Sequence, residues 1–300
     1  MIQVPLMKDA VPTTATYRVV LQNAALRQDC LWEFGPACDA NKVPAGTNTS
    51  TLTRATLGDI LVVGAGLYHC ENDGDVTLTY DDGPDEYTAD LPDLLAKYNA
   101  SATFFITGVN NAKGQIDDTS IAWPGIIKRM HAENHQIASH TWSHANLSAV
   151  TSARRRDEMH KNEMAFRNIL CPIPTYMRPP YSSCTTDSGC EADMAELRYH
   201  VTYFDLDTAD YLNPSPSQIQ NAKTNFDAFF EGKSPVADNA LVIGHDIIEQ
   251  TVHNLTEYML LGIQSRGYRA VTVGECLGDA AENWYRQGDA GVVPSATATP

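Results

Sequence analysis

The feature that most constrains the fold is an alternation that begins at residue 76. From there on, short apolar and β-branched runs alternate with longer amphipathic segments. This pattern predicts strand–helix units around a parallel sheet, because neighbouring parallel strands need long crossover connections. Strands are expected at 76–80, 102–107, 135–139, 175–177, 200–204, 240–244 and 268–273. Helices are expected at 89–98, 121–133, 153–169, 190–197, 216–230 and 248–265, the third one capped by Ser152.

The two ends of the chain lack this alternation. Residues 1–68 contain the polar stretch "VPAGTNTSTLTR" and are predicted to form an N-terminal extension that packs on the main domain. Residues 286–300 include "GVVPSATATP", a composition typical of a linker tail. We therefore expect a single main domain over 69–285.

Composition limits the partners of the protein. The chain has 37 acidic and 21 basic residues, a net charge of -16, which argues against nucleic acid or an anionic membrane surface. It has no continuous apolar run long enough to span a membrane. We expect the protein to be a monomer and its substrate to be neutral or cationic.

Cysteines and sequons point to the secretory route. The chain has seven cysteines and four N-x-S/T sequons, which favours a secreted, disulfide-bonded glycoprotein. The opening residues do not resemble a signal peptide, so any signal is expected to be missing from this sequence. Cys30 with Cys38 and Cys184 with Cys190 could close short loops. Cys70 could pair with Cys276, although spacing alone does not fix connectivity.

Reactive residue types follow the predicted strands. In parallel α/β barrels the loops after the strands converge at one rim, where the chemistry takes place. The residues in these positions can bind metal, move protons or donate hydrogen bonds, and they are Asp81–Asp82, His140, Arg178–Tyr181, Asp205–Tyr211 and His245–Asp246. We expect a functional site at that rim.

Three of these residues suggest a metal site. His140 and His144 are four residues apart in "SHTWSH", a pair that by itself is more often structural. With Asp82 they form a set of two imidazoles and one carboxylate, which leaves positions open on Zn²⁺, as in catalytic zinc sites. The simpler interpretation of "DDGP" is a plain turn, because Asp, Gly and Pro all favour turns. A turn, however, does not require His and Arg at the other strand ends.

Five motifs occur together in order. They are "TYDDGP" (79–84), "HTWSH" (140–144), "RPPY" (178–181), "DTADY" (207–211) and "LVIGH" (241–245). Over about residues 70–275 the chain therefore resembles the polysaccharide deacetylases, carbohydrate esterase family four. It is similar to the secreted fungal members that deacetylate chitin, through "FFITGVNNAKGQI" and its cysteine-rich context. The resemblance implies a distorted (β/α)7 barrel of the TIM type.

The resemblance also implies catalytic roles. Asp82, His140 and His144 would bind Zn²⁺, Co²⁺ or another divalent transition metal, and Asp81 would be the general base. His245 would be the general acid, since an amine leaves poorly unless it is protonated.

Five further residues take supporting roles through the same resemblance. Arg178 would orient the base and Asp207 would orient the acidic histidine. The backbone N–H of Tyr181 would bind the oxyanion, while Tyr211 and Ile243 would form the pocket for the acetyl methyl group.

Two motif positions depart from the family pattern. Tyr80 stands where Phe is usual, a change that should not touch the metal. Tyr211 stands where Trp is commoner, so the apolar wall and the substrate preference are expected to differ.

The expected activity is hydrolysis of N-acetyl groups of chitin or chitooligosaccharides, which leaves glucosamine and acetate. The same site could instead remove O-acetyl groups from xylan or act on peptidoglycan sugars. A different class is a secreted glycan-binding protein without turnover. The filled catalytic positions argue against that class.

Overall fold

The computed structural model describes residues 42–60, 62 and 66–288. The elements below belong to the unit that begins at Val43. The suggested Cys30–Cys38 pair and most of the two terminal segments lie outside the described residues.

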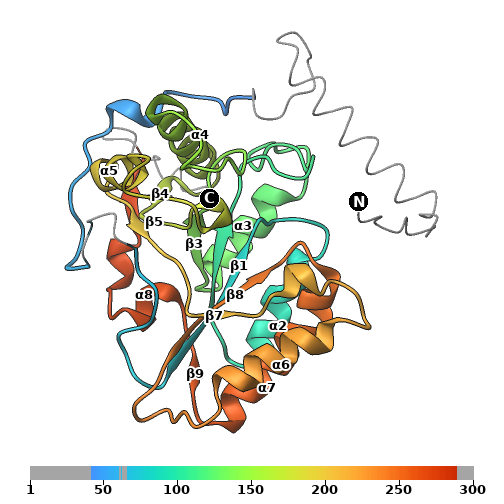
Figure 1. The fold of residues 1–300 in the computed structure, drawn as a ribbon. Helices are drawn as coiled ribbons and strands as arrows, with labels where there is room; N and C mark the ends of the chain where they lie inside the picture. Colours follow the sequence, from blue (N-terminus) through green and yellow to red (C-terminus); the bar gives the residue numbers. More distant parts are fainter. Residues whose placement is uncertain (1–41, 61, 63–65, 289–300) are drawn as a thin grey trace, which may run out of the picture. The chain divides into compact units, whose positions relative to one another are not determined.

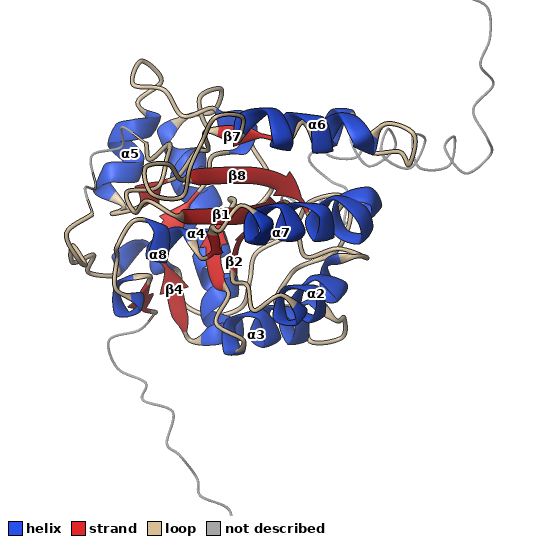
Figure 2. Cartoon of the chain, turned by 90° about the horizontal axis from the view of Figure 1, so that it is seen from below, coloured by secondary structure: helices blue, strands red, loops and turns tan. Residues whose placement is uncertain are grey.

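A parallel sheet forms the centre of this unit and curls into an open half-barrel (Figures 1 and 2). Its strand order is β6-β5-β3-β2-β1-β8-β7, and β9 pairs with β1. The strands are β1 (Asp75–Asp81), β2 (Ala102–Ile106), β3 (Gln136–Ser139), β5 (Tyr176–Met177), β6 (His200–Val201), β7 (Leu206–Asp207), β8 (Ala240–His245) and β9 (Arg269–Ala270). The predicted α/β barrel-like fold is confirmed.

The barrel is open where the chain leaves β6. The strand expected at 200–204 is only His200–Val201, and the chain then crosses to the opposite edge, where β7 pairs with β8. Because β6 and β7 end the two sides of the sheet and do not pair with each other, the barrel stays open.

Helices cover the outside of the sheet (Figure 1). They are α2 (Leu91–Lys97), α3 (Trp123–Ala132), α4 (Ser152–Leu170), α5 (Cys190–Glu196), α6 (Ile219–Phe229), α7 (Thr256–Ser265) and α8 (Val273–Cys276). The N-cap of α4 is Thr151 and not Ser152, since the Thr151 hydroxyl accepts from the Arg154 amide. A π-helical segment, Thr251–Leu255, takes the start of the helix predicted at 248–265. Helix α8, which was not predicted, begins with a capping box.

The two faces of the sheet carry different side chains because a strand alternates with period two. On β1, Leu78 and Tyr80 join the large apolar cluster beneath the helices. On β2, Phe105 instead belongs to a second cluster with Ala138 and Tyr176. Thr79 and Asp81 share a face of β1 opposite Leu78 and Tyr80. The outer face of the sheet is therefore apolar, whereas the inner face carries apolar side chains such as Phe105 beside polar ones such as Asp81.

The strand register brings reactive residues to one edge. In the β1–β8 pair, Asp81 lies opposite His245, and in the β1–β2 pair it lies opposite Phe105. The amide of His140 donates to Ile106 O, and that of Arg178 donates to Ser139 O. Asp81, His140, Arg178 and His245, at the ends of β1, β3, β5 and β8, thus lie along the carboxyl edge of the sheet.

The segment before the sheet is held by a buried carboxylate on α4. Glu163 accepts from Arg54, 2.7 Å from Nη1 to Oε1, and from the hydroxyls of Thr49 and Tyr199. Burial by itself would raise the pKa of Glu163, but the hydrogen bonds from Arg54 hold the pKa below its usual value.

A smaller antiparallel sheet pairs β4 (Pro172–Pro174) with β10 (Tyr285–Gln287).

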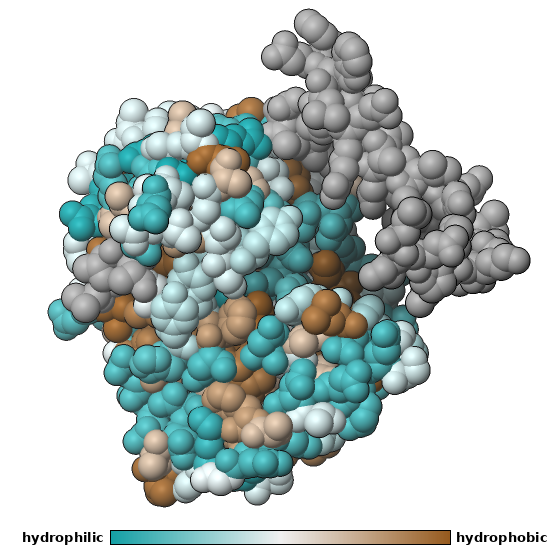
Figure 3. Space-filling view, in the orientation of Figure 1, coloured by the Kyte–Doolittle hydropathy of each residue, from teal (hydrophilic) through white to brown (hydrophobic). Residues whose placement is uncertain are grey.

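The surface in the view of Figure 3 is mostly hydrophilic, and apolar side chains gather in a band across its middle. None of the described helices is both long and apolar enough to cross a membrane.

Among the described residues, two disulfides close loops of very different length. Cys70–Cys276 joins residues 206 apart, and Cys184–Cys190 joins residues 6 apart. These are two of the three pairings suggested by the sequence, and they are confirmed. Cys171 is free and exposed.

Loss of the long-range disulfide should destabilise the protein more than loss of the short one. Chain-entropy arguments give about 5 kcal/mol for a loop of some two hundred residues and about 2 kcal/mol for a loop of six. We expect Cys70→Ala with Cys276→Ala to lower the denaturation midpoint more than Cys184→Ala with Cys190→Ala, measured by urea unfolding. Equal losses would contradict the entropic origin of the difference.

Candidate active site

Asp82, His140 and His144 converge at the carboxyl edge. Their ligand atoms all lie within 4.8 Å of one another. His144 Nε2 is 3.2 Å from Asp82 Oδ1, and His140 Nε2 is 3.8 Å from the same oxygen. The structure therefore brings together the three residues that the sequence predicted as metal ligands.

The hydrogen bonding of His140 suits a metal ligand. Its Nδ1 lies 2.7 Å from the carbonyl oxygen of Arg178. A carbonyl only accepts, so Nδ1 carries the proton and the lone pair on Nε2 faces Asp82 and His144. Burial, with a smaller effect of His144, lowers the pKa of His140 to about 3. This imidazole is neutral at physiological pH, and the set of two nitrogens and one oxygen fits a divalent transition metal.

A buried tryptophan fixes the segment between the two histidines. Trp142 is fully buried and packs against Gly108, where an added Cβ would lie 1.9 Å from the indole ring. Any larger residue at 108 would displace this ring. Thr141 and His144 adopt positive φ, 70° and 59°, so the chain bends sharply between the two histidines. Both imidazoles therefore lie beside the Asp82 carboxylate.

Arg178 holds Asp81. Its Nη1 donates to Asp81 Oδ1 at 2.8 Å and to Thr79 Oγ1 at 2.7 Å, and its Nη2 donates to the carbonyl of Tyr203 at 2.6 Å. The guanidinium also lies over the ring of Phe105, 4.1 Å from its centroid. With Oδ1 fixed, Asp81 Oδ2 lies 3.7 Å from His140 Nε2 and faces the metal-ligand set. The contact matches the orienting role predicted for Arg178.

The carboxylate that holds His245 is Asp210 and not Asp207. Asp210 Oδ1 is 2.8 Å from His245 Nδ1, and its Oδ2 accepts from the His245 amide and from the Thr251 hydroxyl. Asp207 instead accepts from the Ala209 amide and the Tyr211 hydroxyl. The prediction that Asp207 orients His245 is wrong.

The reason for this error is local geometry. The β7 strand ends at Asp207, and a short 3-10 turn, Asp210–Leu212, follows Ala209, which has a φ of 55°. This turn brings the Asp210 carboxylate to His245 at the end of β8. The motif "DTADY" contains both aspartates, and only the backbone path decides which one reaches the histidine.

Asp210 sets the charge of His245. Burial lowers the pKa of His245, but the charge and hydrogen bond of Asp210, aided by Asp81 and Asp82, outweigh it and raise this pKa to about 9. His245 is therefore protonated at neutral pH. Its Nδ1 donates to Asp210, and Nε2 remains as the second proton carrier.

The turn after β1 is tightly packed. Asp82 has a φ of 80°, and an added Cβ at Gly83 would lie 1.9 Å from the Asp246 carboxylate. Only glycine fits there. Asp246 is buried and accepts from Thr88, and burial raises its pKa to about 7.

A hollow of about 450 Å³ lies over these groups. It is lined by the predicted residues Asp81, Asp82, His140, His144, Tyr181, Asp207, Tyr211, Ile243 and His245 and also by Pro179, Ser182, Phe204, Ile247 and Ile248. Tyr181 is 67% exposed and its ring lies 4.7 Å from that of His144. Sequence reasoning missed Phe204, Ile247 and Ile248, because apolar residues in loops carry no motif signal.

Tyr80 lies away from this hollow. Its hydroxyl is 2.9 Å from the Thr256 hydroxyl on α7. The Phe-to-Tyr departure thus adds a hydrogen bond beneath the helices, as expected for a change that does not touch the metal residues.

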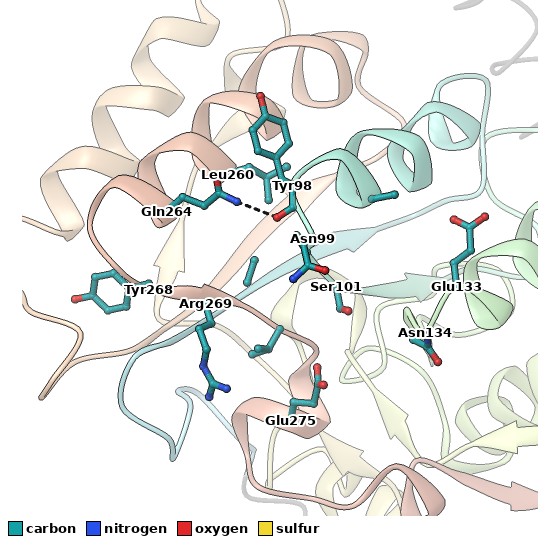
Figure 4. A pocket seen from close by; sticks show the side chains of 14 residues that line it. Tyr98, Asn99, Ser101, Glu133, Asn134, Leu260, Gln264, Tyr268, Arg269 and Glu275 are labelled. Carbon is teal, nitrogen blue, oxygen red and sulfur yellow. Dashed lines mark hydrogen bonds between the residues drawn. The ribbon is translucent and has the colours of Figure 1, made fainter.

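A second hollow, about 650 Å³, lies at the other end of the sheet (Figure 4). One of its walls carries a hydrogen bond from Gln264 to the carbonyl of Tyr98, and its lining contains Glu133, Arg269 and Glu275 but no histidine. Among the described residues, the Asp82, His140 and His144 group is the one found with metal-ligand spacing. The candidate metal ligands and His245 therefore line the smaller hollow and not this one.

Comparisons with known proteins point to one family. The family model described as "Polysaccharide deacetylase" matches residues 69–201. A chitin deacetylase of Colletotrichum lindemuthianum is 41% identical over 254 residues, 84% of this chain and 97% of the relative. A chitin deacetylase of Pestalotiopsis sp is 40% identical over 226 residues, 75% of this chain and 71% of the relative. The solved structure of the Colletotrichum lindemuthianum enzyme has a TM-score of 0.71 at 41% identity, covering 75% of this chain and 96% of that one.

Removal of the Asp210 charge should lower the pKa of His245. The raised pKa stabilises the folded protein below the unfolded value of about 6.5, and this stabilisation is lost as pH rises through about 9. We expect Asp210→Asn to lower the pKa of His245 by one unit or more in an NMR titration, and Asp207→Asn to leave it nearly unchanged. A larger shift in Asp207→Asn than in Asp210→Asn would refute the assignment.

Proposed function

Because this chain belongs to the polysaccharide deacetylase family, we propose that it is a metal-dependent hydrolase that removes N-acetyl groups from chitin or chitooligosaccharides. The products would be glucosamine units and acetate. The observation that carries this proposal is the convergence of Asp81, the Asp82–His140–His144 group and His245 on one hollow. Two relatives named chitin deacetylase, about 40% identical, support the choice of substrate.

Asp82, His140 and His144 would hold the metal, for which we propose Zn²⁺; Co²⁺ or a similar ion fits the same donors. When bound, such an ion polarises a carbonyl group and makes water more acidic.

Asp81 is suited to take up the proton of the attacking water. Its Oδ1 is occupied by Arg178, while Oδ2 faces the hollow. As the water oxygen bonds to the acetyl carbon, its proton passes to Asp81. Arg178 keeps the carboxylate in that orientation, which is the supporting role proposed for it.

His245 is suited to protonate the leaving amine. It is charged at neutral pH, and Asp210 holds its Nδ1, so Nε2 can donate. When the C–N bond breaks, this proton passes to the sugar nitrogen, which leaves as a neutral amine. Asp210 then stabilises the histidine through the cycle.

The remaining predicted residues shape the hollow. Ile243 and Tyr211 would contact the acetyl methyl group, and the Tyr181 amide would donate to the developing oxyanion. The exposed ring of Tyr181 offers an apolar face on which a sugar can stack.

We propose that the protein is secreted. The two disulfides are those expected in an oxidising compartment, and the four sequons suggest glycosylation.

Acetate release from a panel of substrates tests the proposal. We expect release from chitin oligomers that stops when the metal is chelated and returns when Zn²⁺ is added, with less from acetylated xylan and from peptidoglycan. Metal-restored activity on xylan alone would favour the O-acetyl esterase alternative. Chitin binding that is the same in the wild type and Asp81→Asn, with no turnover in either, would favour a glycan-binding protein.

Substitution of His245 should affect amides more than esters. An amine leaves poorly without a proton, whereas the phenolate of an activated acetate ester leaves readily. We expect His245→Ala to lower kcat on chitin oligomers by about 10²-fold or more and to lower ester cleavage much less. Equal losses on the two substrates would contradict the acid role.

A further inference from the structure

The loop after β2, residues 107–113, contacts both segments that carry the metal-ligand residues. The amides of Gly108 and Val109 donate to the carbonyls of Thr141 and Trp142, within the histidine segment. The side-chain amide of Asn110 donates to Asp82 Oδ1 at 3.2 Å. This loop therefore joins the aspartate turn to the histidine turn.

Lys113 binds the backbone of the aspartate turn. Its ammonium lies 2.7 Å from the carbonyl oxygen of Asp82, 2.7 Å from that of Gly83 and 2.8 Å from Thr107 Oγ1. An ammonium has three donors, so these contacts use all of them. The backbone carbonyl of Lys113 accepts from Trp123 Nε1 at 2.8 Å, which ties the residue to α3.

The backbone of Asp82 needs such support. Its φ of 80° lies in a region that is unfavourable for a residue with a side chain and persists only where surrounding contacts hold it. The Thr107 hydroxyl also donates to the Asp82 carbonyl, at 2.7 Å. Lys113, Thr107 and Asn110 together hold Asp82 at both its carbonyl and its carboxylate.

We propose that Lys113 is a positioning residue of the metal site, which holds the Asp82–Gly83 turn so that the Asp82 carboxylate faces His140 and His144. This rests on the proposed function in one respect, that Asp82 is a metal ligand. The Asp82 carboxylate would contact the metal. Lys113 contacts the backbone carbonyls of Asp82 and Gly83, so it acts on the metal only through Asp82.

An electrostatic role and a positioning role of Lys113 predict opposite changes in metal affinity when its ammonium is removed. Removal of a cation close to a metal site leaves the site more negative and would by itself strengthen cation binding. Loss of the clamp on Asp82 would displace a ligand and weaken metal binding. The sign of the change in affinity therefore separates a positioning role from a merely electrostatic one.

The test is zinc affinity, measured by competition with a chromogenic chelator. Lys113→Met keeps the length of the side chain and removes the donors, and Lys128→Met removes one exposed charge on α3 as a matched control. Changes in groups that orient metal ligands typically cost 10–100-fold in affinity. We expect Lys113→Met to bind Zn²⁺ about 10–100-fold more weakly than the wild type and Lys128→Met to bind it equally well. Unchanged or tighter binding by Lys113→Met would overturn the proposal.

A second pair of variants decides the matter if Lys113→Met does not fold. Thr107→Val removes the hydroxyl shared by Lys113 and the Asp82 carbonyl, and Thr107→Ser keeps it. We expect weaker zinc binding in Thr107→Val than in Thr107→Ser, and equal affinities would count against the clamp.

Chemical rescue gives a further readout. Treatment of Lys113→Cys with 2-bromoethylamine restores an ammonium on a chain of nearly the same length. We expect this to recover most of the zinc affinity, and treated wild type controls for modification of Cys171. Failure to recover would contradict a role for the ammonium.

Asp82→Ala in the same assay separates the two levels of inference. If it binds Zn²⁺ as tightly as the wild type, Asp82 is not a ligand, and the metal site and the role of Lys113 both fail. If Asp82→Ala loses binding while Lys113→Met keeps it, only the inference about Lys113 fails.

Discussion

The structure depends on how the charges of two adjacent aspartates are accommodated. Like charges 4 Å apart repel by about 4 kcal/mol in a partly solvated site. Asp81 is the last residue of β1 and points toward Arg178, whereas Asp82 leaves the strand with positive φ and points toward His144. One carboxylate is thus balanced by a fixed guanidinium and the other by the cation that the two histidines would share. Two residues adjacent in the sequence thus face different partners, which suits Asp81 to its proposed role as proton acceptor and Asp82 to its proposed role as metal ligand.

Arg178 makes this arrangement possible because it is hydrogen-bonded on several sides. A buried charge is costly unless it is fully hydrogen-bonded. Arg178 contacts Asp81, Thr79 and the carbonyls of Thr202 and Tyr203, which links β1 to the chain that leaves β6. Its own carbonyl fixes the ring of His140. The side chain and the backbone of one residue therefore orient both Asp81, the proposed base, and His140, a proposed metal ligand.

Sequence reasoning found the parts of the site that come from the strands themselves. Residues after parallel strands must meet at one edge, so Asp81, Asp82, His140 and His245 could be placed together from pattern alone. It failed where a loop path decides, as in the choice of Asp210 over Asp207. It also missed Lys113, because its role depends on two backbone carbonyls, which leave no trace in a motif.

His140 and His245 show how surroundings give one residue type two different charge states. Burial lowers the pKa of both, yet His140 has a pKa of about 3 and His245 one of about 9. His140 donates to a neutral carbonyl and stays uncharged, which leaves a lone pair for a metal. His245 donates to the carboxylate of Asp210, which stabilises the imidazolium and leaves a proton to give. The partner behind the ring, a carbonyl at His140 and a carboxylate at His245, therefore suits the first to its proposed role as a metal ligand and the second to its proposed role as an acid. The fold places one on each side of Asp81.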